Sequence, residues 1–146
     1  MSTPPSDSKP LVLLVDDDDD SRFLYAEYLT SLGSYRIAEA GDGRQALEMA
    51  VALKPGAIVL DMSLPFLDGR EVARALRLDP STREIAILAL TGYADMKASD
   101  GSGGDFQMVL VKPCLPEALT TALETVLRAR PQSPESHPVA QSCSPV

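Results

Sequence analysis

The sequence predicts an α/β fold, a doubly wound sheet of five parallel strands with helices on both faces. Five short apolar runs alternate with amphipathic segments along the chain. The runs are apolar at nearly every residue, which is typical of strands that are buried on both faces of a parallel sheet. Because strand and helix patterns alternate along one chain, five βα units are the economical count.

The apolar runs define the expected strands, and the segments between them define the expected helices. Strands are expected at 11–15, 35–40, 57–61, 85–91 and 108–112. Helices are expected at 21–32, 43–53, 69–78 and 116–130. A further helix should follow the fourth strand at 94–105, where three glycines stand. Each glycine costs about 1 kcal/mol relative to alanine inside a helix, so this helix should be short or frayed.

Capping residues and apolar stripes support these helices. Asp20 or Ser21 can cap the first helix, and Asp42 can cap the second. Pro116 followed by Glu117 suits the first turn of the last helix. Two stripes near the 3.6-residue period are expected to face the core. They are Phe23, Leu24, Tyr28 and Leu32 in the first helix, and Leu119, Leu123, Val126 and Leu127 in the last.

Composition limits the number of domains and the class of function. With 146 residues, 45% hydrophobic and 23% charged, the chain suits one domain with a real core. Its net charge of −8 repels phosphate backbones, so direct nucleic-acid binding is not expected. Its apolar runs are too short to cross a bilayer, and the start lacks the apolar region of a signal peptide. We therefore expect a soluble cytoplasmic protein without a membrane partner.

The two ends of the chain are expected to lie outside the folded domain. Pro131 should stop the last helix, so the domain is expected to span 9–130. Residues 1–8 and the Pro/Ser-rich tail 131–146 cannot bury enough apolar surface to order themselves. Both segments are therefore expected to be disordered.

Cysteine and histidine offer no independent site. Cys114 and Cys143 are too few for a disulfide framework and have no second ligand at metal spacing, so both should be reduced thiols. The only histidine, His137, belongs to the tail, and we interpret it as solvated.

Polar residues at the ends of the apolar runs are the candidate site. In an open parallel sheet, ligands bind beyond the carboxyl ends of the strands. The residues found there are Asp16 and Asp17, Asp61, Thr91 and Lys112, on the first, third, fourth and fifth strands. Three converging carboxylates would repel one another unless a cation held them, and an all-oxygen set suits a hard ion. The inferred ion is Mg²⁺.

The same residues suit phosphoryl transfer. A phosphoryl transition state spreads negative charge over its equatorial oxygens and needs fixed positive charge and donors around them. Lys112 and Thr91 supply these groups. The carboxylate on the central strand, Asp61, is the expected nucleophile, and an acyl phosphate is its product.

Four motifs occur in order at matching strand ends. They are Asp16-Asp17 after LVLLV, DMSLPFLDG at 61–69, ALTG at 89–92 and Lys112-Pro113. Together they resemble the receiver domains of bacterial two-component response regulators, whose fold is the CheY-like, flavodoxin-like (βα)5 arrangement. The resemblance extends from residue 11 to residue 130, and the segments 39–47 and 70–91 share it.

The resemblance implies a signalling role for Asp61. It would accept the phosphoryl group from a sensor histidine kinase or a phosphotransfer protein. Thr91 would sense the phosphoryl group and Lys112 would pair with it, while the Lys112–Pro113 bond would be cis. The domain would not be an enzyme beyond self-phosphorylation and self-dephosphorylation. No DNA-binding or enzymatic output domain follows residue 130 in the sequence, so we expect output through a downstream partner protein, a phosphorelay role, or derivation from a larger protein by excision.

The resemblance also implies how Mg²⁺ is held. Asp17 would be a direct ligand, Asp16 would act through water, and Asp61 would belong to the same ligand set. The backbone carbonyl of Ser63 would complete the protein ligands.

Other residues in these motifs have simpler interpretations. Within the run of five aspartates, Asp18 and Asp19 are interpreted as a solvated acidic loop. Pro65, Asp68 and Gly69 are interpreted as a turn that starts a helix.

One departure from the family affects the expected switch. Val109 occupies the position, three residues before the strand-five lysine, where an aromatic residue or histidine is usual. Valine has no ring to relocate. We therefore expect phosphorylation to order or reposition residues 92–105.

Three alternatives remain to be weighed. A haloacid-dehalogenase-type phosphatase needs a second carboxylate two residues after its nucleophile, where this chain has Ser63. A flavodoxin-like electron carrier needs a phosphate loop after strand one, where the aspartates would repel a flavin phosphate. A degenerate receiver would act as a phosphorylation-independent interaction module, and the intact Asp17, Asp61, Thr91 and Lys112 count against it.

Overall fold

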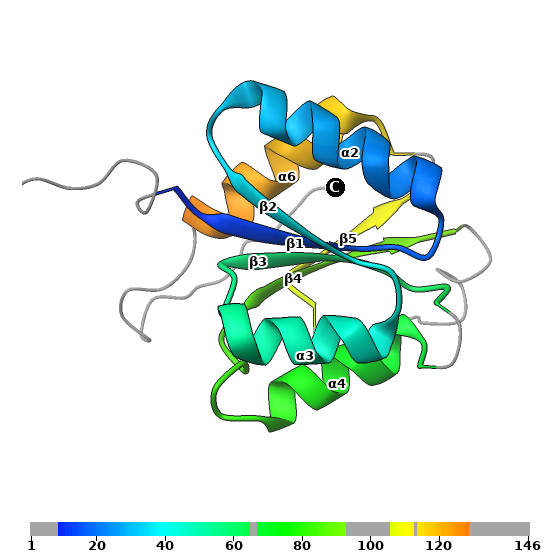
Figure 1. The fold of residues 1–146 in the computed structure, drawn as a ribbon, viewed down its shortest axis with the longest axis vertical. Helices are drawn as coiled ribbons and strands as arrows, with labels where there is room; N and C mark the ends of the chain where they lie inside the picture. The colour runs from blue at the N-terminus through cyan, green and yellow to red at the C-terminus, as the bar shows by residue number, and fades with distance from the viewer. Residues whose placement is uncertain (1–8, 65–66, 93–105, 113, 129–146) are drawn as a thin grey trace, which may run out of the picture.

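A single sheet organises the chain, as a computed structural model of residues 9–64, 67–92, 106–112 and 114–128 shows (Figure 1). All neighbouring strands are parallel, and their order is β2-β1-β3-β4-β5. The strands are β1 (Leu11–Val15), β2 (Arg36–Ala40), β3 (Ala57–Asp61), β4 (Ala86–Thr91) and β5 (Met108–Val111). The predicted five-stranded parallel sheet is confirmed, and every strand end lies within one residue of its expected position.

Helices cover both faces of the sheet, which makes it doubly wound (Figure 1). On one face lie α2 (Asp19–Leu32) and α6 (Pro116–Arg128), and on the other lie α3 (Gly43–Leu53) and α4 (Gly69–Leu78). The bounds of α3 and α4 agree with the sequence prediction. Within the described ranges, no helix combines the length and apolar character needed to cross a bilayer.

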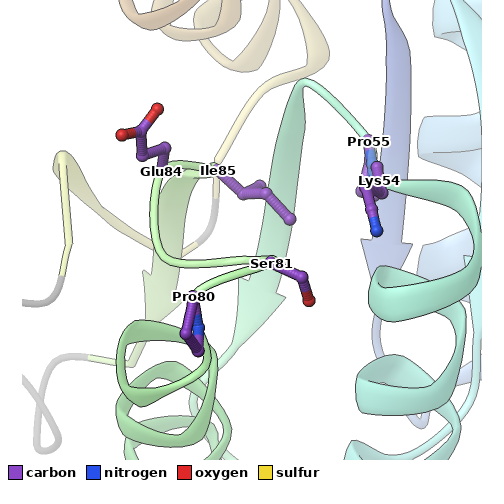
Figure 2. A pocket seen from close by; sticks show the side chains of 6 residues that line it. All are labelled: Lys54, Pro55, Pro80, Ser81, Glu84 and Ile85. Carbon is purple, nitrogen blue, oxygen red and sulfur yellow. The ribbon is translucent and has the colours of Figure 1, made fainter.

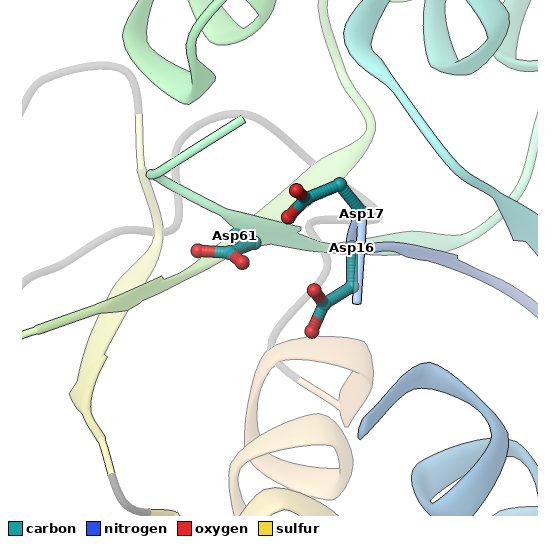
Figure 3. A group of neighbouring side chains, drawn as sticks. All are labelled: Asp16, Asp17 and Asp61. Atoms are coloured by element: carbon teal, nitrogen blue, oxygen red, sulfur yellow. The ribbon is translucent and has the colours of Figure 1, made fainter. Parts of the chain in front are cut away.

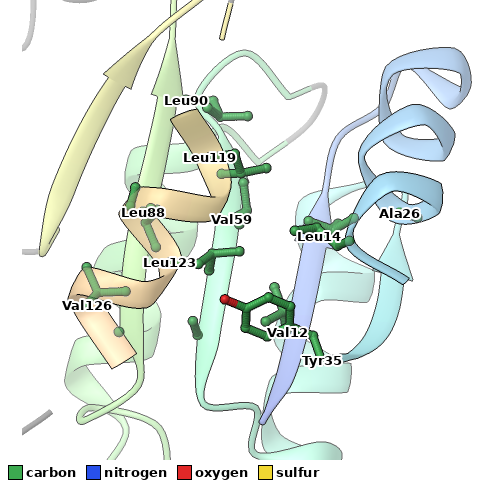
Figure 4. Close-up of a cluster of buried hydrophobic side chains, with 14 residues drawn as sticks. Val12, Leu14, Ala26, Tyr35, Val59, Leu88, Leu90, Leu119, Leu123 and Val126 are labelled. Carbon is green, nitrogen blue, oxygen red and sulfur yellow. The ribbon is translucent and has the colours of Figure 1, made fainter. Parts of the chain in front are cut away.

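The strands separate two hydrophobic cores. Alternate residues of a strand point to opposite faces, so β1, β3 and β4 each contribute to both cores. The core under α2 and α6 includes Val12, Leu14, Val59, Leu88, Leu90, Leu119, Leu123 and Val126 (Figure 4). The core under α3 and α4 includes Leu13, Val15, Ile58, Leu60, Ile87, Val72 and Leu76. Burial on both sides explains why β1, β3 and β4 are apolar at nearly every residue.

The buried face of α2 differs from the predicted stripe. Phe23 and Leu24 are 60% and 58% exposed, and Leu32 is 42% exposed, so assigning these three residues to the core was wrong. The helix instead buries Ala26 and Leu29 against the sheet. Apolar residues occur on both sides of this helix, so periodicity alone could not decide which side packs. The stripe of α6 is confirmed, with Leu119, Leu123 and Val126 buried and Leu127 packed against the core.

The start of α2 also differs from the prediction. The helix begins at Asp19 and its N-cap is Asp18, not Asp20 or Ser21. The Asp18 carboxylate accepts hydrogen bonds from the backbone N–H of Ser21 at 3.3 Å and from its hydroxyl at 2.7 Å. Asp18 is exposed, as expected, but it has this capping role as well. In a run of aspartates every residue is a good N-cap, so the sequence could not select one.

The remaining caps fix the loops that follow β2 and β3. Asp42 caps α3 through the N–H of Gln45, as predicted. Asp68 caps α4 and forms a capping box with Glu71, which confirms its interpretation as a helix-starting residue. Gly69 lies so close to β3 that a Cβ there would stand 2.8 Å from the Asp61 carbonyl oxygen. The first turn of α4 therefore packs directly against the backbone that carries Asp61.

Candidate functional site

The candidate site lies beyond the carboxyl ends of β1 and β3. Val15 pairs with Leu60 in the register of these strands, so the residues that follow, Asp16 and Asp61, are neighbours. The chain leaves β1 toward β2 on one side, while β3 lies on its other side. This is the topological switch point, where parallel α/β sheets bind their ligands.

Three carboxylates meet at this point. Oxygen atoms of Asp16, Asp17 and Asp61 all lie within 4.8 Å of one another (Figure 3). Asp16 and Asp61 are only 4% and 3% exposed, whereas Asp17 faces solvent. Two buried carboxylates with a third at the rim form an all-oxygen donor set with an open side for water. That set fits a hard divalent cation such as Mg²⁺, which keeps several waters when it binds protein.

Hydrogen bonds hold both oxygens of the Asp61 carboxylate. Oδ1 accepts a hydrogen bond from the backbone N–H of Ser63 at 3.0 Å. Oδ2 lies 3.0 Å from Nζ of Lys112. The Asp61 side chain is therefore oriented by the turn that follows its own strand and by the residue that follows β5.

Burial controls the protonation of Asp16. Removal from water raises the pKa of Asp16 to about 6, and the nearby Asp61 carboxylate also raises it. The Asp18 N–H, which donates to Oδ1 of Asp16 at 2.9 Å, opposes this shift, as does Lys112. Without a cation, the site therefore holds a proton more readily than an ordinary pair of aspartates.

This raised pKa predicts how stability varies with pH in the metal-free protein. Folded Asp16 keeps its proton up to about pH 6, whereas unfolded Asp16 loses it near its ordinary pKa of 3.8. The contribution of Asp16 to the free energy of unfolding is therefore fully present below about pH 3.8, and it is lost as the pH rises to about 6. Asp16→Asn should remove this loss, a change on the order of 2–3 kcal/mol in the free energy of unfolding. Urea unfolding with a chelator at a series of pH values measures it, and identical pH profiles for both proteins would contradict the assignment.

Thr91 and Lys112 lie beside the carboxylates. Thr91 is the buried last residue of β4, the strand next to β3, and its hydroxyl donates to the Gly92 carbonyl at 3.1 Å. The Lys112 N–H donates to the Thr91 carbonyl at 2.8 Å, so these two residues are neighbours across β4 and β5. The structure thus brings Asp16, Asp17, Asp61 and Lys112 together and places Thr91 on the adjoining strand end.

Arg22 is a residue near the site that the sequence analysis missed. Its Nη1 donates to the backbone carbonyl of Asp16 at 2.6 Å. It also forms ion pairs with Asp19 at 2.7 Å and with Glu39 at 3.0 Å. The guanidinium therefore links the turn at 16–18, called here the acidic turn, to α2 and to β2. The i,i+3 spacing of Asp19 and Arg22 is the one sequence signal that could have pointed to it.

Several sequence predictions concern residues outside the described ranges. They are the cis Lys112–Pro113 bond, the turn role of Pro65, the helix at 94–105, the disorder of 1–8 and 131–146, and the states of His137 and Cys143. Cys114 is a free, half-buried thiol, and burial raises its pKa, which favours the unreactive protonated form. Val109 is an exposed residue of the edge strand β5.

A separate pocket lies at the other end of the sheet. It has a volume of about 340 Å³ and is lined by Lys54, Pro55, Pro80, Ser81, Glu84 and Ile85 (Figure 2). These residues precede β3 and β4, at the amino ends of the strands. The pocket is therefore not part of the carboxylate site.

Known proteins share both the sequence pattern and the fold. The family pattern of the response regulator receiver domain matches residues 12–124. A Rhizobium etli protein named "Probable chemotaxis protein CheY" is 33% identical over 122 residues, which cover 81% of this chain and 92% of that protein. The chain spans about half the length of other relatives, for example 52% of the transcriptional regulatory protein PrrA of Mycobacterium tuberculosis.

Solved structures agree with this relationship. Chemotaxis response regulator CheY4 of Vibrio cholerae has a TM-score of 0.73 and 30% identity, covering 82% of this chain and 99% of that one. The receiver domain of sensor histidine kinase PA1611 from Pseudomonas aeruginosa, with a magnesium ion in its active-site cleft, has a TM-score of 0.72 and 29% identity. It covers 84% of this chain and all of that one. The chain belongs to the response regulator receiver domain family.

Proposed function

We propose that this receiver domain accepts a phosphoryl group on Asp61 in a Mg²⁺-dependent reaction and signals through protein–protein contacts. The observation that carries the proposal is the position of the Asp61 carboxylate. It is buried, it lies within 4.8 Å of the Asp16 and Asp17 carboxylates, and it pairs with Lys112 at 3.0 Å. A candidate nucleophile, two further carboxylates that could hold a cation and a positive charge thus lie together at the carboxyl ends of the strands.

The reaction forms one bond and breaks one bond at phosphorus. A carboxylate oxygen of Asp61 attacks the phosphoryl group, the bond from phosphorus to the donor's leaving group breaks, and an acyl phosphate remains on the protein. The Lys112 ammonium stabilises the charge on the equatorial oxygens. The Thr91 hydroxyl, which donates to the Gly92 carbonyl at 3.1 Å, is the group proposed to turn toward the phosphoryl group.

Asp16, Asp17, Asp61 and the Ser63 carbonyl are proposed as the protein ligands of Mg²⁺. When bound, the ion neutralises the carboxylates and the incoming phosphoryl oxygens. The burial of Asp16 and Asp61 supports this assignment, because uncompensated buried charges are costly.

The donor and the receiver of the signal are proposed to be other proteins. The only histidine of the chain, His137, belongs to the tail, so we assign the donor to a sensor histidine kinase or phosphotransfer protein in the cytoplasm. The net charge of −8 supports a protein target over nucleic acid. The output change expected at 92–105 lies, apart from Gly92, outside the residues that the structure describes. We propose no enzymatic role beyond self-phosphorylation and self-dephosphorylation.

Intact-mass measurement with a small phosphodonor tests this function. Incubation with acetyl phosphate and Mg²⁺ should add one phosphoryl mass to the protein, and a chelator should prevent the addition. A protein that gains no mass under either condition would instead support the alternative, a degenerate receiver that works by phosphorylation-independent contacts.

A further inference from the structure

Tyr25 links α2 to the segment that carries Lys112. Its phenol hydroxyl donates a hydrogen bond of 2.6 Å to the backbone carbonyl of Cys114, across 89 positions of the sequence. Cys114 lies between the end of β5 and the start of α6. The contact therefore joins α2, which follows the acidic turn, to the segment that connects β5 to α6.

Among the described residues, a second hydrogen bond also holds that segment. The Lys112 N–H donates to the Thr91 carbonyl at 2.8 Å, which fixes the segment to β4. The Cys114 carbonyl accepts from Tyr25, which fixes the segment to α2. The Lys112 side chain is long and 37% exposed, yet its Nζ lies 3.0 Å from Asp61. A flexible side chain keeps such a position more often when its backbone is held on both sides.

The surroundings of Tyr25 favour a stable donor. The ring is half-buried and packs against the same core as Cys114. Burial raises the pKa of Tyr25, and the nearby Asp16 and Asp61 raise it further. The phenol therefore stays protonated and able to donate.

We propose that Tyr25 is a positioning residue for phosphoryl transfer, acting through the Cys114 carbonyl to hold Lys112 against Asp61. This inference rests on the proposed function of Asp61. It predicts a division of roles, because the proposed Mg²⁺ ligands come from β1 and β3 whereas Tyr25 acts on the chain after β5. Loss of the hydroxyl should therefore affect the rate of transfer and leave the affinity for Mg²⁺ unchanged.

Tyr25→Phe tests the proposal, with Tyr28→Phe as the matched control from the same helix. At saturating Mg²⁺, Tyr25→Phe should lower the rate constant for labelling by acetyl phosphate roughly 3- to 10-fold, the factor expected from one neutral hydrogen bond. Its Kd for Mg²⁺, from calorimetry, should stay within about twofold of wild type, and Tyr28→Phe should change neither quantity. A similar loss of rate in both variants, or a weaker Kd in Tyr25→Phe alone, would overturn the proposal.

A double-mutant cycle separates positioning of Lys112 from a general loss of stability. In the Lys112→Ala background, Tyr25→Phe should cause no further loss of rate, because the group that it positions is already absent. If the double variant instead lost the product of the two single rate losses, Tyr25 would act independently of Lys112, which would contradict the proposal.

Amide hydrogen exchange distinguishes failure of this inference from failure of the proposed function. If the wild-type protein accepts no phosphoryl group, the proposed function fails, but the anchor can still be measured. Tyr25→Phe should then speed exchange at the backbone amides of Lys112, Leu115 and Glu117 relative to Tyr28→Phe. Unchanged exchange there would show that the hydroxyl does not hold the segment.

Discussion

Asp61→Asn should gain no phosphoryl mass from acetyl phosphate and Mg²⁺ under conditions that label the wild-type protein fully. The amide has nearly the same shape as the carboxylate but lacks the anionic oxygen that attacks phosphorus. We expect the rate to fall at least about 100-fold, the size of effect that follows removal of a nucleophile. Intact-mass spectrometry over a time course measures the loss.

Asp20→Asn is the matched control for this substitution. Asp20 is exposed in the first turn of α2 and lies outside the carboxylate cluster, so its variant should label like the wild type. The two substitutions change the net charge equally, which removes overall electrostatics as an explanation. Labelling of Asp61→Asn at the wild-type rate would show that another residue is the acceptor.

Mg²⁺ should raise the melting temperature of the protein, and Asp17→Ala should abolish the effect. Binding to the folded state alone stabilises by about 2.7 kcal/mol at a hundredfold excess over Kd, which corresponds to roughly 10 °C for a domain of this size. Asp17 is the exposed member of the cluster, so its removal should disturb the core little. It should also relieve repulsion, and the metal-free variant should melt no lower than the metal-free wild type.

Thermal melts in Mg²⁺ and in NaCl of equal ionic strength measure this effect. Asp20→Ala, which removes an exposed charge outside the cluster, should keep the full Mg²⁺ dependence. A wild-type protein that melts at the same temperature in both salts would contradict the assignment of the cluster as a metal site.

The strands and the site could be predicted because both follow from local residues. β1, β3, β4 and β5 are apolar runs that each lead into a polar residue, and parallel strands bring their carboxyl ends to one edge of the sheet. Asp16, Asp61, Thr91 and Lys112 are polar residues at such ends. That these residues lie close to one another could therefore be predicted without knowing how the helices pack.

The face of α2 could not be predicted, because the sequence is ambiguous there. Phe23 and Leu24 are apolar, but so are Tyr25, Ala26 and Leu29, and the two sets point in different directions. Packing against the sheet and α6 selects the second set, and Phe23 and Leu24 remain exposed. Tertiary contacts thus decided what the periodicity of the helix left open.

The same ambiguity hid the contact between Tyr25 and Cys114. The hydroxyl can reach that carbonyl only because α2 turns Tyr25 toward α6, and the predicted stripe did not include this residue. The three contacts of Arg22 likewise join the acidic turn, α2 and β2, which come together only in the folded chain. The sequence located the groups proposed to react, but not the groups that hold them.

Chemical location of the phosphoryl group tests the central claim most directly. Borohydride reduces an acyl phosphate to an alcohol, so a phosphorylated Asp61 becomes homoserine, which peptide mass spectrometry can locate. After treatment with acetyl phosphate and Mg²⁺, homoserine should appear at position 61 and disappear when the metal is chelated. Homoserine at another aspartate, or none anywhere in a protein that has gained phosphoryl mass, would contradict the claim that Asp61 is the phosphoacceptor.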